Sequence, residues 1–129
     1  MFGTNDVGYI SPEVYRANLT RIVEISAERG IIPILSTIPD RRDYDETVLV
    51  FNRIVSEVAQ AQRVPLWDYH SAMTALPDRG LTWDGVHPSE GPFGVDGAGS
   101  FTPDNLNYGY VVRNLTGLQM LNAVWQATR

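Results

Sequence analysis

One nearly unbroken apolar stretch, residues 31–38 (Ile-Ile-Pro-Ile-Leu-Ser-Thr-Ile), constrains the fold of this chain more than any other part of its sequence. A strand that is covered on both faces by helices shows such a continuous apolar run. Pro33 lies near the start of the stretch, where the loss of one backbone donor is tolerated. The stretch therefore predicts a buried strand over residues 31–38 of an α/β fold.

A helix is predicted directly before this strand, over residues 12–29. Ser11, Pro12 and Glu13 provide a hydroxyl N-cap, a proline at the first helical position and an acid in the first turn. Gly30 supplies the C-terminal stop. The apolar residues that recur at helical spacing are Tyr15, Leu19, Ile22 and Val23.

A second amphipathic helix is predicted after the strand, over residues 45–62, with either Asp43 or Asp45 as its cap. A short strand over residues 64–67 and a short helix over residues 69–75 follow. The apolar face of the second helix consists of Val48, Phe51, Val55 and Val58.

The chain begins with Met1 and Phe2, which resemble the end of another strand because turn residues follow directly. With this strand included, the predicted order is β, α, β, α, β. Such an order implies parallel strands that are joined by right-handed crossovers.

The last part of the chain departs from this pattern. Residues 90–104 are so rich in glycine and other turn residues that we interpret them as a loop insertion, and loops of this length are usually functional or disordered. Thr102 and Pro103 repeat the cap-then-proline signal and predict a final helix to the chain end. Its apolar face would be Tyr108, Val111, Val112, Leu115, Leu118, Leu121 and Trp125.

Composition excludes several functions. The 129 residues have the length of one ordinary domain, so we expect residues 1–129 to form a single domain. A formal net charge of −5 and the absence of a Lys/Arg run argue against nucleic-acid partners and against attraction to anionic membranes. No apolar run approaches the length of a membrane span. Without cysteine, the chain has neither a disulfide framework nor a thiolate nucleophile.

The best candidate for chemistry is His87, in the run Asp-Gly-Val-His-Pro-Ser over residues 84–89. An imidazole titrates near the working pH and can act as a general base. Asp84, three residues earlier, can reach back to the ring and fix its tautomer. The alternative is a simple turn in which Asp84 caps its own backbone and His87 lies on the surface.

Asn5 is the second candidate, in the run Gly-Thr-Asn-Asp over residues 3–6. Its side-chain amide could donate to a substrate carbonyl oxygen as negative charge develops there. The alternative is that Asn5 merely tolerates a left-handed turn at a strand end.

Aromatic and acidic residues give further candidates. Trp83, beside Asp84, is the tryptophan that we expect to touch substrate, whereas core packing is the default for Trp67 and Trp125. Asp68, His70, Asp84 and His87 have suitable ligand types for a metal, but they have no recognised ligand spacing, so no metal site is expected.

Together the two motifs resemble the sequence blocks of the SGNH/GDSL ester hydrolase family, which carry Ser, Gly, Asn and His in that order. Residues 3–6 are similar to the third block and residues 84–89 to the fourth, while the Gly-Asp-Ser block and the glycine block are missing. The resemblance implies a flavodoxin-like three-layer α/β/α fold around a parallel sheet, here incomplete at its N-terminus. It also implies that no metal or organic cofactor is needed.

The resemblance further implies hydrolysis of a carboxylic ester of a small molecule or carbohydrate through an acyl-serine intermediate. His87 would be the base, Asp84 its orienting residue and Asn5 the oxyanion-hole donor. Gly3 and Trp83 are the candidate substrate-binding residues.

None of the serines lies in a Gly-Asp-Ser turn: Ser11, Ser26, Ser36, Ser56, Ser71, Ser89 and Ser100. We therefore expect the nucleophile to lie outside this chain. Two alternatives stay open, a non-catalytic ligand-binding remnant and a C-terminal fragment that complements a separate N-terminal piece. In either case the uncovered apolar strand and helix faces predict marginal stability or self-association.

Overall fold

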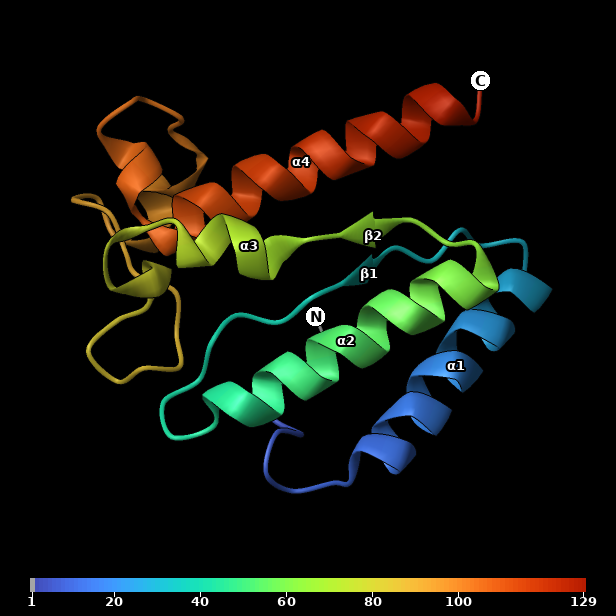
Figure 1. Ribbon diagram of the computed structural model, residues 1–129. Helices are drawn as coiled ribbons and strands as arrows, with labels where there is room; N and C mark the ends of the chain where they lie inside the picture. Colours follow the sequence, from blue (N-terminus) through green and yellow to red (C-terminus); the bar gives the residue numbers. More distant parts are fainter. Residues whose placement is uncertain (1) are drawn as a thin grey trace. The chain divides into compact units, whose positions relative to one another are not determined.

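The computed structural model describes residues 2–129, in which helices alternate with short strands up to residue 74 and only helical elements and turns follow (Figure 1). These residues fall into two compact units, one up to Asp68 and one from Tyr69 onward. The elements are α1 (Pro12–Glu28), β1 (Leu35–Ser36), α2 (Asp45–Gln62), β2 (Leu66–Trp67), α3 (Tyr69–Thr74), η1 (Pro77–Gly80), η2 (Val95–Gly99), η3 (Asn105–Asn107) and α4 (Gly109–Ala127). None of the helices in residues 2–129 is long and apolar enough to cross a membrane.

The two strands pair in parallel, as the β, α, β order predicts. Leu35 lies opposite Leu66, and Ser36 lies opposite Trp67. The predicted strand bounds, 31–38 and 64–67, are too long. Pro33 cannot donate to a ladder, and Ile31 and Ile32 keep 57% and 52% of their surface exposed.

The predicted strand end at the start of the chain is not observed as such. Phe2 lies outside any strand and is 70% exposed, and Met1 lies outside the described residues. The backbone of residues 3–10 instead forms consecutive turns, in which Gly3 and Asp6 each accept two hydrogen bonds.

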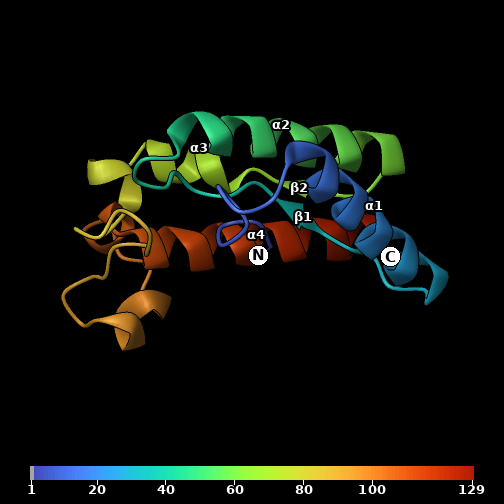
Figure 2. The same ribbon diagram turned by 90° about the horizontal axis from the view of Figure 1, so that it is seen from below.

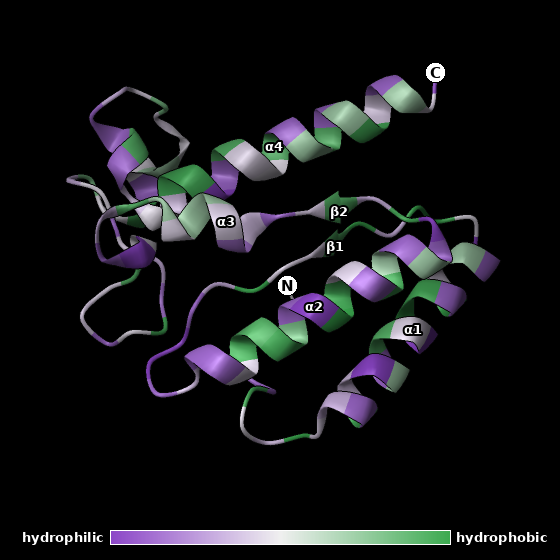
Figure 3. Cartoon of the chain, in the orientation of Figure 1, coloured by the Kyte–Doolittle hydropathy of each residue, from purple (hydrophilic) through white to green (hydrophobic). Residues whose placement is uncertain are grey.

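The core of the first unit lies where α1 packs along α2 (Figures 1 and 2). Polar and apolar residues alternate along both helices (Figure 3), which is the pattern of helices buried on one side. The rings of Tyr15 and Phe51 stack at a centroid distance of 4.2 Å. The other buried apolar residues of this cluster are Val7, Leu19, Val23, Leu35, Ile38, Val48, Ile54, Val55, Val58 and Ala59.

Local capping chemistry sets both ends of α1. Ser11 accepts a hydrogen bond from the Val14 amide at 3.3 Å, as the N-cap pattern predicts. At the other end Gly30 has φ +71° and donates to Ala27, while Ile31 donates to Ser26. These two bonds form a Schellman motif, so Gly30 ends the helix as predicted.

The start of α2 differs from the prediction. Tyr44 occupies the cap position without a side-chain cap, and Asp45 is the first helical residue. Asp43 has φ +67° and precedes the cap. Neither aspartate caps the helix, although Asp45 and Glu46 lie in the first turn, where negative charge is favoured.

Asn52, on the buried face of α2, pairs with the backbone of Ile38 just beyond β1. Its Oδ1 accepts from the Ile38 amide at 2.7 Å, and its Nδ2 donates to the Ile38 carbonyl at 2.9 Å. Both polar groups of the Ile38 backbone are thereby paired inside the core. The side chain of Asn52 therefore satisfies the backbone just after β1.

In the second unit α3 packs against α4, and the chain between them forms turns and short 3-10 helices. The predicted final helix begins at Gly109, not near Pro103, because η3 and a bend intervene. A Cβ at Gly109 would lie 2.1 Å from the Gly80 carbonyl oxygen. Close backbone packing therefore requires this glycine.

The glycine-rich stretch, residues 90–104, also contains more structure than its composition predicts. It includes η2 and an isolated bridge between Gly91 and Gly94. Along α4 only the first turn is buried, at Gly109, Val111 and Val112. Leu118, Leu121 and Trp125 are more than half exposed. Exposed apolar side chains of this kind favour self-association, which stays a prediction for this chain.

We expect Asn52→Leu to lower the free energy of unfolding by about 1–3 kcal/mol for each Ile38 group left unpaired. The change keeps the side-chain size similar but removes both hydrogen bonds to Ile38. Urea unfolding followed by circular dichroism measures the difference. Asn18→Leu, at an exposed position of α1, is the matched control. Equal stability of the two variants would contradict the role given to Asn52.

Candidate active site

The loop that carries Asp84 and His87 is closed by its own backbone. Leu81 and Pro88 form an antiparallel bridge, and the Thr82 amide donates to the His87 carbonyl at 2.8 Å. Gly85, at the tip, has φ +70°, a conformation that favours glycine. The loop therefore holds its shape through contacts within residues 81–88.

Asp84 is fixed by four hydrogen bonds. Its Oδ1 accepts from Thr82 Oγ1 at 2.6 Å, from the Val86 amide at 2.8 Å and from the His87 amide at 3.0 Å. Its Oδ2 lies 2.7 Å from His87 Nδ1. Asp84 thus caps its own turn and contacts the imidazole at the same time, so the two interpretations of this motif are compatible.

The hydrogen bonds indicate which atom of the Asp84–His87 pair carries the proton that lies between them. The Thr82 hydroxyl, the His87 ring and the two backbone amides together hold the pKa of Asp84 far below its usual range. An ionised carboxylate can only accept, so His87 Nδ1 must carry the proton that lies between them. In the neutral ring Nε2 then keeps its lone pair and can take a proton from a reactant.

The His87 side chain is 67% exposed, so its Nε2 is open to solvent. Within residues 2–129, Asp84 is the only hydrogen-bond partner of the His87 ring. The neighbouring Trp83 is 88% exposed and therefore accessible to a ligand. Its role in substrate binding stays a prediction.

Asn5 belongs to the first unit, where it lies in the turn that follows Gly3. The Gly3 carbonyl accepts from the amides of Asp6 at 2.9 Å and Val7 at 3.1 Å. Asn5 is exposed, and within the described part of the chain its side chain makes no hydrogen bond. The amide is therefore available as a donor, and its role in an oxyanion hole stays a prediction.

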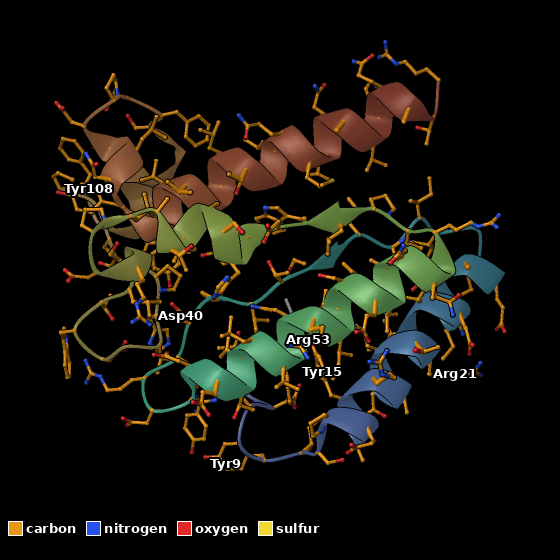
Figure 4. All side chains as sticks on the ribbon, viewed as in Figure 1. Tyr9, Tyr15, Arg21, Asp40, Arg53 and Tyr108 are labelled. Carbon is orange, nitrogen blue, oxygen red and sulfur yellow. The ribbon has the colours of Figure 1, made fainter. Side chains whose placement is uncertain are left out.

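Tyr15 holds the start of this turn. It points from α1 into the space beside α2 (Figure 4), and a Cβ at Gly3 would lie 2.7 Å from its hydroxyl oxygen. Burial, with a smaller contribution from the Asp6 carboxylate, raises the pKa of Tyr15 to about 12. The hydroxyl stays protonated and donates to the Phe2 carbonyl at 3.3 Å. Gly3 is thus a packing position, and a substrate contact from it remains a prediction.

The other tryptophans differ in their surroundings. Trp67 is half-buried in β2, whereas Trp125 is 56% exposed and has the Arg129 guanidinium 4.6 Å from its ring. The expectation of core packing is therefore wrong for Trp125, because the end of α4 is not covered by the described residues. Among residues 2–129, no group of three His, Asp or Glu side chains is arranged so that it could hold a metal ion.

Four of the serine hydroxyls make structural hydrogen bonds. Ser89 Oγ accepts from the Gly109 amide at 2.8 Å and so holds the start of α4. Ser11 caps α1, while Ser26 and Ser56 donate to carbonyls one helical turn earlier. Among residues 2–129 no serine hydroxyl is hydrogen-bonded to His87.

Two residues at these sites were missed from the sequence. Thr82, which bonds Asp84, lies only two positions away and could have been found by asking what satisfies the second carboxylate oxygen. Arg41 donates to the Thr4 carbonyl from 37 positions away. No local pattern could have indicated that contact.

Several solved structures resemble this chain, including the following three. A GDSL-like lipase from Bacteroides thetaiotaomicron superposes with a TM-score of 0.68 at 21% identity, over 94% of this chain and 60% of that one. A lipase/acylhydrolase from Enterococcus faecalis superposes with a TM-score of 0.59 at 24% identity, over 89% of this chain and 58% of that one. An alpha/beta hydrolase enzyme from the metagenome of Lake Arreo, Spain, superposes with a TM-score of 0.65 at 21% identity, over 92% of this chain and 56% of that one.

These likenesses confirm the predicted α/β fold of SGNH/GDSL type. The chain spans less than two thirds of each of the three solved structures. No curated protein sequence matched it. The model of the GDSL-like Lipase/Acylhydrolase family, however, matches residues 1–91, which include Asn5, Asp84 and His87. The match covers more than half of the sequence, and the chain therefore belongs to this family.

Proposed function

We propose that this chain supplies the base, its orienting carboxylate and one oxyanion donor for the hydrolysis of carboxylic esters. The observation that carries the proposal is the contact of 2.7 Å between Asp84 Oδ2 and His87 Nδ1, on a carboxylate whose other oxygen accepts three hydrogen bonds. This arrangement orients the His87 imidazole through Nδ1 and leaves Nε2 able to accept a proton. Membership of an acylhydrolase family supports the choice of esters.

In the proposed reaction a serine hydroxyl attacks the ester carbonyl carbon while His87 Nε2 takes its proton. The carbonyl oxygen becomes an anion and accepts a hydrogen bond from the Asn5 side-chain amide. Asp84 stabilises the imidazolium, which then protonates the departing alcohol. Water, deprotonated by the same ring, then attacks the acyl carbon. As the bond from this carbon to the serine oxygen breaks, the imidazolium returns the proton to that oxygen, and the acid leaves. These steps use only side chains and water.

The nucleophilic serine is proposed to come from outside these 129 residues. Support comes from Ser11 and Ser89, whose hydroxyls accept backbone hydrogen bonds. It also comes from the His87 ring, to which no serine within the described residues is bonded. The acyl and alcohol groups of the substrate are proposed only as those of a small-molecule or carbohydrate ester.

The purified chain should hydrolyse p-nitrophenyl acetate weakly, through water activated by His87. We expect His87→Gln to lower this rate about 10-fold, less than the ~10²–10⁴-fold that a positioned base contributes in a complete site. His70→Gln is the matched control, because any accessible imidazole attacks this activated ester. Equal losses in the two variants would mean non-specific imidazole catalysis and would sink the proposal for His87.

The location of the nucleophile is tested separately with a fluorophosphonate probe that labels activated serines. The intact mass of the folded chain after exposure should show no adduct, because none of its serines is paired with His87 in residues 2–129. Peptide mapping locates any label that does form. A stoichiometric adduct on one serine would show that the chain holds its own nucleophile.

Thr82→Val should raise the pKa of Asp84 toward its ordinary value, because the Thr82 hydroxyl makes the largest contribution to lowering it. A carboxyl whose pKa is lowered by folding stabilises the loop above the unfolded pKa, and this contribution is lost as the pH falls through the folded pKa. Titration of the carboxyl ¹³C resonance of Asp84 measures the change. Thr82→Ser keeps the hydroxyl and should titrate as the wild type does. An unchanged titration in the valine variant would show that Thr82 does not hold Asp84.

A further inference from the structure

We propose that Arg41 is a positioning residue for Asn5: it holds the peptide group that precedes Asn5, and so sets the direction of the Asn5 backbone N–H and restrains the backbone from which the Asn5 side chain projects. The inference rests on the proposed function of Asn5 as an oxyanion donor. It adds a residue that the sequence motifs do not contain.

The contact that carries this inference joins Arg41 Nη1 to the Thr4 carbonyl oxygen at 2.5 Å. The same nitrogen lies 3.5 Å from the Val7 carbonyl oxygen. The Thr4 carbonyl belongs to the same planar peptide unit as the Asn5 amide N–H. Arg41 therefore fixes the plane of that unit, and the two carbonyls bracket the turn that contains Asn5.

The direction of the Asn5 backbone N–H follows from this geometry. In a trans peptide the carbonyl and the N–H point in opposite directions, and the structure has no cis peptide bond among residues 2–129. With the Thr4 carbonyl turned toward Arg41, the Asn5 N–H is turned away from it. Within the described residues neither this N–H nor the Asn5 side chain is hydrogen-bonded. Both donors are therefore available to an oxyanion.

Arg41 is itself held in place by the loop between β1 and α2. Near the start of the loop lies Ile38, whose peptide groups are bonded to the Asn52 side chain. It ends at Tyr44, whose amide donates to the Arg41 carbonyl at 3.0 Å and whose ring lies 5.2 Å from the Arg41 guanidinium carbon. A guanidinium that is restrained in this way loses little further freedom when it binds the turn.

The ring of Tyr44 restrains the far end of the same turn. A Cβ at Gly8 would lie 2.3 Å from a ring carbon of Tyr44, so the ring packs directly on the glycine backbone. Gly8 has φ +83°, which also favours glycine. One loop thus contacts the turn at Thr4, Val7 and Gly8, while Tyr15 restrains it at Phe2 and Gly3.

The chemistry of arginine suits this role better than that of lysine. Its planar fork carries several donors in fixed directions, whereas an ammonium is a single charge on a flexible stem. Arg41→Lys should therefore keep part of the restraint, and Arg41→Gln should lose most of it.

The first measurement is amide hydrogen exchange by NMR in these two variants. We expect the amides of Asp6 and Val7, which donate to Gly3, to exchange roughly 10-fold faster in Arg41→Gln and by an intermediate factor in Arg41→Lys. Leu35 and Thr37, in the ladder between the strands, should keep their rates. Arg53→Gln removes the same charge from an exposed position of α2 and is the control. Unchanged exchange at Asp6 and Val7 overturns the inference, and Arg41→Lys carries the test if the glutamine variant does not fold.

The second measurement is a double-mutant cycle on the hydrolysis of p-nitrophenyl acetate. If Arg41 acts through Asn5, Arg41→Gln lowers the rate when Asn5 is present and has no further effect in the Asn5→Ala background. Equal losses in both backgrounds overturn the inference alone. A wild-type rate in Asn5→Ala overturns the proposed function of Asn5, and the inference falls with it.

Discussion

The two hydrogen bonds between the Asn52 side chain and the peptide groups of Ile38 are the constraint on which the rest of the first unit depends. They satisfy buried backbone groups just after the chain leaves β1. Because they fix Ile38, they also fix the start of the loop that brings Arg41 and Tyr44 to the Asn5 turn. A polar residue in the core thus links the packing of α2 to a surface turn.

In the second unit, the Asp84–His87 pair is held in place by contacts between residues that are close in sequence. Asp84, Thr82 and His87 lie within six consecutive residues, and their contacts stay inside a loop closed by a backbone bridge. Ser89 joins this loop to α4, because its hydroxyl accepts a hydrogen bond from the Gly109 amide. The Gly80 backbone packs closely against the same glycine. The imidazole and its carboxylate therefore depend on short-range geometry, and the Asn5 turn depends on long-range packing.

These two modes of support explain which parts of the fold could be predicted. Ser11, Pro12 and Gly30 set the ends of α1 through bonds to residues within one or two turns, so the sequence locates this helix closely. The bounds of β1 could not be predicted, because pairing with Leu66 and the side chain of Asn52 decide them. The prediction that the final helix begins near Pro103 is wrong for a similar reason. Gly109, the first residue of that helix, packs so closely against the Gly80 carbonyl that only glycine fits, and this contact is distant in sequence.

The sequence by itself determined the α/β order, the parallel sense of the strands, and the Asp84–His87 pair with its three-residue spacing. Each of these follows from interactions between near neighbours or from connection rules that hold for any chain. Only the tertiary structure decided where β1 ends, what holds the Asn5 turn, and that the end of α4 stays exposed within the described residues. Those features depend on groups that meet across tens of residues, and a residue type alone does not specify which distant carbonyl a guanidinium or an amide will find.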